Sequence, residues 1–148
     1  MVQDYSIIIG TVGQGLGVSS DAGETWTKIR QPIPSEATVR ALGVYPDNPH
    51  KILAGSDVRI FRSEDNGTTW EKLDSPFDDL QIWSVALDPT NTETIFAGTR
   101  PESYRSRDGG KSWDKLAMGV NMECPIGAPR TTNMIVDPRD NRTIWAGI

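Results

Sequence analysis

The sequence predicts an all-β fold: a β-propeller of four-stranded antiparallel blades, present here as about half a ring. Three observations carry this prediction. An eight-residue motif occurs three times at nearly constant spacing, a second motif alternates with it, and no segment shows the apolar spacing of a helix. Four short strands repeated every roughly 40–50 residues are the signature of propeller blades.

The first motif has the form Ser-x-Asp-x-Gly-x-Thr/Ser-Trp. Its copies begin at Ser19, Ser63 and Ser106, and their tryptophans are 44 and 43 residues apart. A hairpin turn leaves backbone N–H groups unpaired, so we expect the aspartate to accept hydrogen bonds from them and the glycine to adopt a positive φ. We expect the tryptophan to pack between adjacent sheets. The residues with these structural roles are Asp21, Gly23, Trp26, Asp65, Gly67, Trp70, Asp108, Gly110 and Trp113.

The second motif is an apolar strand, an Asp-Pro or Pro-Asp turn and an Ile-x-Ala-Gly strand. Its copies end at Gly55, Gly98 and Gly147, and a degenerate copy ends at Gly10. Proline cannot continue a central strand, so the proline pairs mark turns. We expect blade 1 over residues 5–30, blade 2 over 38–74, blade 3 over 81–117 and the start of blade 4 over 131–148.

These blades do not make a complete ring. We count three strands in the first unit, four in each of the next two and two in the last. A closed ring has about 4–8 complete blades. We therefore expect further blades from the rest of a longer protein, or a second polypeptide or second copy of the chain that completes the ring.

Composition limits the classes of ligand. The chain has 20 acidic and 15 basic residues and a net charge of −5, so no nucleic-acid partner is expected. No apolar run is long enough to cross a bilayer, and we expect no membrane partner. The single cysteine, Cys124, and the absence of a signal peptide favour the cytoplasm, with export left open. No calcium-loop pattern accompanies the acidic turns, so we expect neither metal nor cofactor.

The three motif copies resemble the Asp-box, or bacterial neuraminidase repeat, of the sialidase- and sortilin-like β-propeller superfamily. Similar repeats occur in sialidases, xyloglucan-degrading glycosidases, sortilin-type receptors and photosystem assembly factors. The resemblance implies that the boxes lie on the outer rim, away from the ligand. It argues against a sialidase proper, because those enzymes carry an arginine motif before the first box and residues 1–19 contain no arginine.

In propellers of this type, ligands usually meet the face formed by the connections between blades and by the turns between second and third strands. The connection at 117–131 is the longest and extends its repeat to 49 residues, against 43 for the repeat before it. We expect Arg40, Trp83 and Asn133 at equivalent positions where the inner strands begin. The candidate ligand-binding residues are Arg40, Arg59, Trp83, Arg100, Cys124, Arg130 and Asn133.

Two chemistries fit these candidates. Several arginines together can clamp a carboxylate or phosphate, although salt-bridged rim residues would look the same in sequence. Glu102 and Glu123 are candidate catalytic carboxylates, because glycoside hydrolysis uses such a pair. The expected function is thus a ligand-binding or hydrolytic propeller acting on a small molecule or glycan at its central face, of glycosidase type if it is an enzyme. The alternative is a non-catalytic scaffold that binds protein or glycan.

Overall fold

The computed structural model describes residues 5–117 and 130–148, which form thirteen β-strands and no helix. In this described part, therefore, no helix is long and apolar enough to cross a membrane. The first sheet consists of β1 (Ile7–Gly10), β2 (Leu16–Ser19) and β3 (Thr27–Ile29). The second consists of β4 (Val39–Tyr45), β5 (Asn48–Ser56), β6 (Ile60–Ser63) and β7 (Glu71–Leu73). The third consists of β8 (Ser84–Leu87), β9 (Ile95–Gly98), β10 (Ser103–Ser106) and β11 (Asp114–Leu116), and the fourth of β12 (Asn133–Val136) and β13 (Ile144–Gly147).

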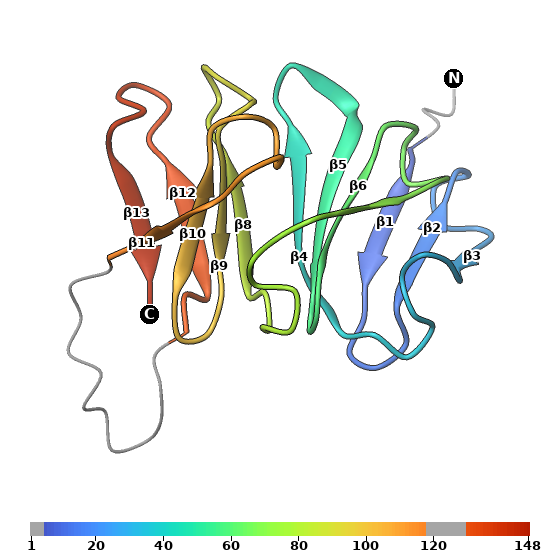
Figure 1. The fold of residues 1–148 in the computed structure, drawn as a ribbon. Coiled ribbons are helices and arrows are strands. Elements are labelled where there is room, and N and C mark those ends of the chain that lie inside the picture. The colour runs from blue at the N-terminus through green and yellow to red at the C-terminus, as the bar shows by residue number, and fades with distance from the viewer. Residues whose placement is uncertain (1–4, 118–129) are drawn as a thin grey trace.

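The four sheets stand side by side in chain order, as an arc of blades (Figure 1). Every strand pairs antiparallel with its chain neighbour within its blade. The inner strands β4, β8 and β12 contact one another from blade to blade. In the first blade β1 takes the place nearest to β4. The described part of the chain is thus a partial propeller, with the first and fourth blades at its two ends.

Apolar side chains fill the seams between successive blades. Between the first and second blades the buried residues are Leu16, Ile29, Ile33, Ala37, Val39, Ile52, Ala54, Phe61 and Trp70. Between the second and third blades they are Ala41, Tyr45, Leu53, Ile60, Leu73, Phe77, Ile82, Ile95, Ala97 and Tyr104. Ala86, Phe96, Met134 and Val136 fill the third seam. Because alternate residues of a strand point to opposite faces, each middle blade contributes one face to each of its two seams.

Each Asp-box closes its turn through a network of hydrogen bonds, as in the second blade. The Asp65 carboxylate accepts hydrogen bonds from the backbone N–H of Thr69 at 2.8 Å and from its hydroxyl at 2.6 Å. The Ser63 hydroxyl donates to Asp65 at 2.9 Å and accepts from the N–H of Gly67 at 2.8 Å. Gly67 has a φ of +80°, which favours glycine. The serine, buried in all three boxes, therefore links the carboxylate to the turn.

The box tryptophans differ in their surroundings. Trp70 is 8% exposed in the seam between the first two blades, and Trp113 packs edge-on against Phe77 with ring centroids 4.9 Å apart. Trp26, which we also expected between sheets, is instead 46% exposed. It faces away from the second blade with Ile9, and no sheet of the described residues covers that side. Among the described residues, therefore, no second sheet packs on Trp26 as it does on Trp70.

Gly10, Gly55 and Gly98, which end their strands, lie against the segment that leads into the inner strand of the next blade. A Cβ built on Gly10 would lie 2.5 Å from the Val39 carbonyl oxygen, and one on Gly55 would lie 2.5 Å from Ile82 Cγ2. The backbone N–H of Ile82 then donates to the Ser56 carbonyl at 2.9 Å. Equivalent bonds run from Val39 to Thr11 and from Thr131 to Thr99. These crossings hold the start of each inner strand against the preceding blade.

The strand register corrects one expected equivalence. Gly98 pairs with Ser84 and Gly147 pairs with Asn133, so Asn133 occupies the position of Ser84. The backbone N–H of Trp83 donates to Gly98, and that of Thr132 donates to Gly147. Thr132, rather than Asn133, is therefore the counterpart of Trp83.

Candidate functional site

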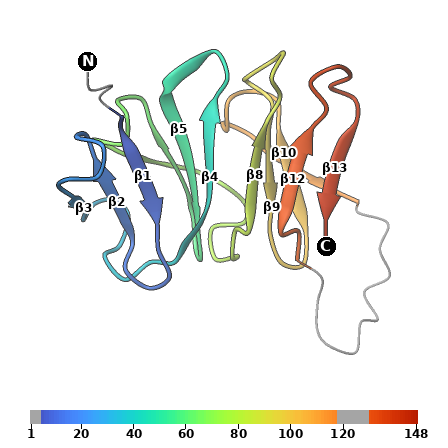
Figure 2. The same ribbon diagram turned by 180° about the vertical axis from the view of Figure 1, so that it is seen from behind.

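The face that we expect to bind the ligand lies at the end of the arc opposite to the β4–β5, β8–β9 and β12–β13 turns. In Figure 1 the connections β3–β4 and β7–β8 and the turns β1–β2, β5–β6 and β9–β10 all lie at the lower end, and Figure 2 shows the same arrangement from behind. These loops belong to three different blades. Side chains that begin the inner strands at this end are therefore brought together from distant parts of the sequence.

Three of the predicted ligand-binding residues meet at this end. The Arg40 guanidinium carbon lies 4.5 Å from the centroid of the Trp83 ring, and that of Arg130 lies 4.7 Å from the same centroid. Arg40 comes from β4, Trp83 directly precedes β8, and Arg130 lies three residues before β12. We call these three residues the Arg–Trp–Arg cluster. Cation–π attraction holds both cations on one ring.

The cluster is held in position by buried polar contacts that the sequence did not predict. Thr131, which is 4% exposed, bonds to the Ser103 hydroxyl at 2.9 Å, and its carbonyl accepts from the Ser84 hydroxyl at 2.8 Å. These bonds hold the residue next to Arg130. On the other side, the backbone groups of Thr38 and Asp57 bond at 2.9 Å and hold the start of β4. Isolated threonines at strand entrances carry no sequence signal that would have marked them.

The cluster concentrates positive charge. No carboxylate of the described residues lies within 4.0 Å of the guanidinium of Arg40 or Arg130, and both arginines are exposed. The indole N–H of Trp83 is buried and finds no acceptor among the described residues. Two guanidinium groups beside an aromatic ring, neither paired with a carboxylate of the described residues, can bind an anion, especially a carboxylate that matches the planar fork of arginine.

The other predicted arginines do not join the cluster. Arg59 lies 3.9 Å from the Asp78 carboxylate, in an ion pair that Lys72 also shares. Arg100 is exposed in the β9–β10 turn. Within the described residues it forms no ion pair, and it makes no cation–π contact with Trp83. Asn133 is exposed at the start of β12. Of the four arginines predicted to bind the ligand, only Arg40 and Arg130 thus meet around Trp83.

Glu102 has the wrong environment for a general acid. Lys115 and the Tyr104 hydroxyl, the latter at 2.8 Å, both donate to its carboxylate. These hydrogen bonds, with that from Lys115 the stronger, lower the pKa of Glu102 below its ordinary value. A glycosidase acid needs a raised pKa, so this site does not support that role for Glu102. Glu123 and Cys124, predicted in the longest connection, lie outside the described residues.

Residues 5–117 and 130–148 contain no candidate metal-binding site. No group of three or more histidine, cysteine, aspartate or glutamate side chains there is arranged to hold a metal ion. The Asp-box carboxylates are already occupied by turn hydrogen bonds, as at Asp21 and Asp108.

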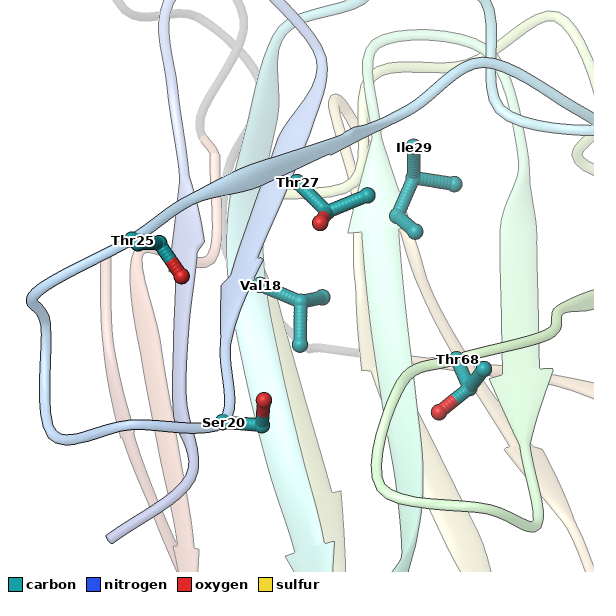
Figure 3. Close-up of a pocket in the computed structure, with 6 residues that line it drawn as sticks. All are labelled: Val18, Ser20, Thr25, Thr27, Ile29 and Thr68. Carbon is teal, nitrogen blue, oxygen red and sulfur yellow. The ribbon is translucent and has the colours of Figure 1, made fainter.

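A separate hollow of about 190 Å³ lies beside the first two boxes (Figure 3). Ser20, Thr25 and Thr27 of the first blade line one side, and Thr68 of the second blade faces them. Val18 and Ile29 complete the lining, which contains no charged group. Its hydroxyls belong largely to the turns that close the boxes, so we regard it as part of the scaffold.

The arrangement of boxes and blades agrees with the family match. The family described as Sortilin-Vps10 (sortilin, neurotensin receptor 3) matches residues 58–147, which is more than half of the chain. The chain belongs to the Sortilin-Vps10 family. No curated protein shows significant sequence similarity to it. The Asp-box resemblance inferred from the three motif copies is therefore confirmed.

Solved structures share the fold of this Sortilin-Vps10 chain. An ancestral GH74 enzyme matches 99% of it with a TM-score of 0.75 and 20% identity, over 20% of that enzyme. The GH74 xyloglucanase from Xanthomonas campestris matches 93% with a TM-score of 0.68 and 21% identity, over 23% of its own length. YCF48 bound to D1 peptide matches 93% with a TM-score of 0.64 and 14% identity, over 43% of its length.

These likenesses confirm the predicted propeller class. The chain spans about a fifth to two fifths of the length of these structures, so it corresponds to part of a propeller that needs more blades. At such identities the likeness establishes the fold and leaves the ligand to be inferred from the Arg–Trp–Arg cluster.

Proposed function

We propose that this chain contributes a non-catalytic binding surface for an acidic peptide segment, centred on the Arg–Trp–Arg cluster. The observation that carries the proposal is the convergence of Arg40 and Arg130 on the Trp83 ring, at 4.5 and 4.7 Å, without a carboxylate of the described residues within 4.0 Å of either guanidinium. A ligand carboxylate would supply the missing counter-charge. The aromatic ring would pack against an adjacent apolar side chain of the ligand.

The names of two similar proteins support a peptide rather than another anion. The matched family is described as a receptor for neurotensin, and YCF48 was solved bound to the D1 peptide. The two GH74 structures favour a glycan as the second candidate ligand. For this chain the peptide has the stronger support, because the cluster offers two full positive charges and Glu102, whose pKa is lowered by its hydrogen bonds, lacks the raised pKa of a glycosidase acid.

The proposal is tested by isothermal titration calorimetry on the full chain. The ligands are a short peptide rich in aspartate and aromatic residues, its asparagine counterpart and a xyloglucan oligosaccharide. We expect the acidic peptide alone to bind, with affinity that falls as salt is added. Arg40→Ala and Arg130→Ala should each weaken binding at least about tenfold, because each removes a charge-assisted bond.

Arg142→Ala is the matched control. Arg142 is an exposed arginine in the β12–β13 turn, paired with Asp140 at 3.0 Å, and its loss should leave peptide affinity unchanged. If the acidic peptide binds the Arg40→Ala/Arg130→Ala double variant as tightly as the parent chain, the site is misplaced. Preferential binding of the oligosaccharide would favour the glycan function instead.

A further inference from the structure

The second Asp-box holds the only Asn-Gly pair of the sequence, Asn66-Gly67. In such a pair the backbone nitrogen of the glycine can attack the side-chain carbonyl carbon of the asparagine, because glycine has no Cβ to hinder the approach. Asparagine is accordingly one of the thermolabile residues of proteins. The pair lies in the turn between β6 and β7, and the Arg–Trp–Arg cluster makes no use of it.

The box itself does not require an asparagine at this position. The residue between the aspartate and the glycine is Ala22 in the first box and Gly109 in the third. These two residues and Asn66 have positive φ values of 58°, 71° and 57°. All three donate a backbone N–H over 2.9–3.0 Å, and the accepting carbonyls belong to Tyr5, Glu93 and His50. The Asn66 side chain is thus an addition to a turn that closes without it.

The closed box withholds the nitrogen that would attack. Gly67 is buried, and its backbone N–H donates to the Ser63 hydroxyl at 2.8 Å. Attack requires this nitrogen to lose its proton and to turn toward the Asn66 side chain. The N–H cannot leave Ser63 easily, because that hydroxyl is itself fixed by its bond to Asp65 at 2.9 Å. The nitrogen therefore becomes available when the box opens.

The side-chain amide of Asn66 is held as well. Its Oδ1 lies 3.0 Å from Nδ1 of His50, which is a hydrogen bond when Nδ1 carries the proton. The backbone N–H of Asn66 donates to the carbonyl of the same histidine at 2.9 Å. These two bonds tie Asn66 to the start of β5. His50 is exposed, so we expect its side chain to restrain Asn66 less than the buried Ser63 restrains Gly67.

We propose that Asn66 is a deamidation site that the closed Asp-box protects and that reacts when the box of the second blade opens. The nitrogen of Gly67 bonds to Cγ of Asn66, and the side-chain nitrogen leaves as ammonia. The cyclic imide then takes up one water molecule and opens at either carbonyl, which gives an aspartate or an isoaspartate at position 66. This reactivity is separate from the peptide binding proposed above and needs no ligand.

The reaction should prevent the box from closing again in its original form. An isoaspartate lengthens the backbone of the turn by one carbon atom, and the first blade leaves little room for it. A Cβ built on Gly67 would lie only 2.9 Å from Ile8 Cδ1 and 3.3 Å from Val18 Cγ2. Both products also add a negative charge next to Asp65 in the chain. Deamidation is therefore a lasting mark that this box has opened.

Incubation of the full chain in mildly alkaline buffer tests the proposal, with peptide mapping by mass spectrometry to follow residue 66. A synthetic peptide copying residues 60–73 is the unprotected reference, because an isolated hairpin is marginally stable at best. We expect the folded chain to convert at least about tenfold more slowly than this peptide. In the folded chain, Ser63→Ala should accelerate conversion at least about fivefold and His50→Ala at least about twofold.

Ser106→Ala is the matched control. Ser106 is 1% exposed and makes the same two bonds in the third box, to Asp108 and from Gly110, both at 2.8 Å. Its loss should weaken the fold as the loss of Ser63 does, while the second box stays closed and Asn66 reacts as in the parent chain.

Three results would overturn the proposal. The first is conversion in the folded parent chain at the rate of the peptide, because the box would then give no protection. The second is an unchanged rate in Ser63→Ala. The third is equal acceleration by Ser63→Ala and Ser106→Ala, because Asn66 would then react through unfolding of the whole chain and not through opening of its own box.

Discussion

The side-chain amide of Asn141 donates a hydrogen bond to the Asp88 carboxylate over 2.9 Å, joining a turn of the fourth blade to a turn of the third. It also donates to the Thr90 hydroxyl at 2.9 Å. Thr92 makes the corresponding bond to Asp47 of the second blade at 2.8 Å. The proline turns of neighbouring blades are thus linked in a row at the end opposite to the Arg–Trp–Arg cluster.

Loss of this link should loosen the fourth blade. Burial disfavours the charged form of Asp88, but hydrogen bonds from Thr90, Asn91 and Asn141 outweigh it and lower the pKa of this carboxyl. Asn141→Ala should destabilise the fold by about 1–2 kcal/mol in urea unfolding, because a bond to a charged acceptor is lost. Asn91→Ala, whose amide bonds only within its own turn to Thr94, should cost less. Equal costs would argue against the link between blades.

The buried serine of a box should matter more for stability than an exposed serine of another box. Ser63 is 1% exposed and its hydroxyl satisfies both Asp65 and the N–H of Gly67. Ser63→Ala leaves that N–H buried and unpaired, at a cost of about 1–3 kcal/mol. Ser20→Ala, at an exposed position, should change the unfolding free energy by less than about 0.5 kcal/mol. Chemical denaturation of both variants measures the difference, and indistinguishable midpoints would contradict the role assigned to Ser63.

Two tryptophans of identical motif position should differ in their contribution to stability. Trp70→Ala removes a side chain that is 8% exposed and should cost about 3–5 kcal/mol. Trp26→Ala removes one that is 46% exposed and should cost about 1 kcal/mol or less. Thermal and urea unfolding of the full chain compare the two. A large loss for Trp26→Ala would show that its outer face is covered in solution.

The boxes should make the fold sensitive to acid. Hydrogen bonds from the Ser112 hydroxyl and backbone, and from Ser106, lower the pKa of Asp108 from 3.8 to about 2. Those from Thr25 and Ser19 lower the pKa of Asp21 to about 2 in the same way. Because the folded pKa lies below the unfolded value, this stabilisation is complete above about pH 4 and is lost as the pH falls toward 2.

Thermal unfolding midpoints measured between about pH 5 and pH 2 test this. They should fall steadily below about pH 4, and carboxyl NMR shifts of Asp21 and Asp108 should titrate near pH 2. Midpoints that stay constant down to pH 2, or carboxyls that titrate near 4, would contradict the bonding seen in the boxes.

The sequence predicted most residues of the candidate site, but it did not predict which of them contact one another. Arg40 and Trp83 were predicted from their positions at strand entrances, and Arg130 from the longest connection between blades. Their contacts depend on how three blades align, which no local pattern reports. Thr131 was missed because its importance lies in bonds to Ser84 and Ser103, residues distant in the sequence. The surroundings of Glu102 were also not visible locally: Tyr104 on β10, the strand that follows it, and Lys115 on the neighbouring strand both bond to its carboxylate.

The sequence by itself determined the local structure: each Asp-box closes its own turn, so Asp65, Gly67 and their counterparts could be assigned from eight residues. It also determined the propeller class, because a repeated period requires repeated blades. Only the tertiary structure decided which repeat positions are buried. Trp26 and Trp70 occupy the same motif position, yet within the described residues only Trp70 has a neighbouring blade to pack against. Burial depends on the surface opposite a side chain, and that surface comes from another part of the chain or from another molecule.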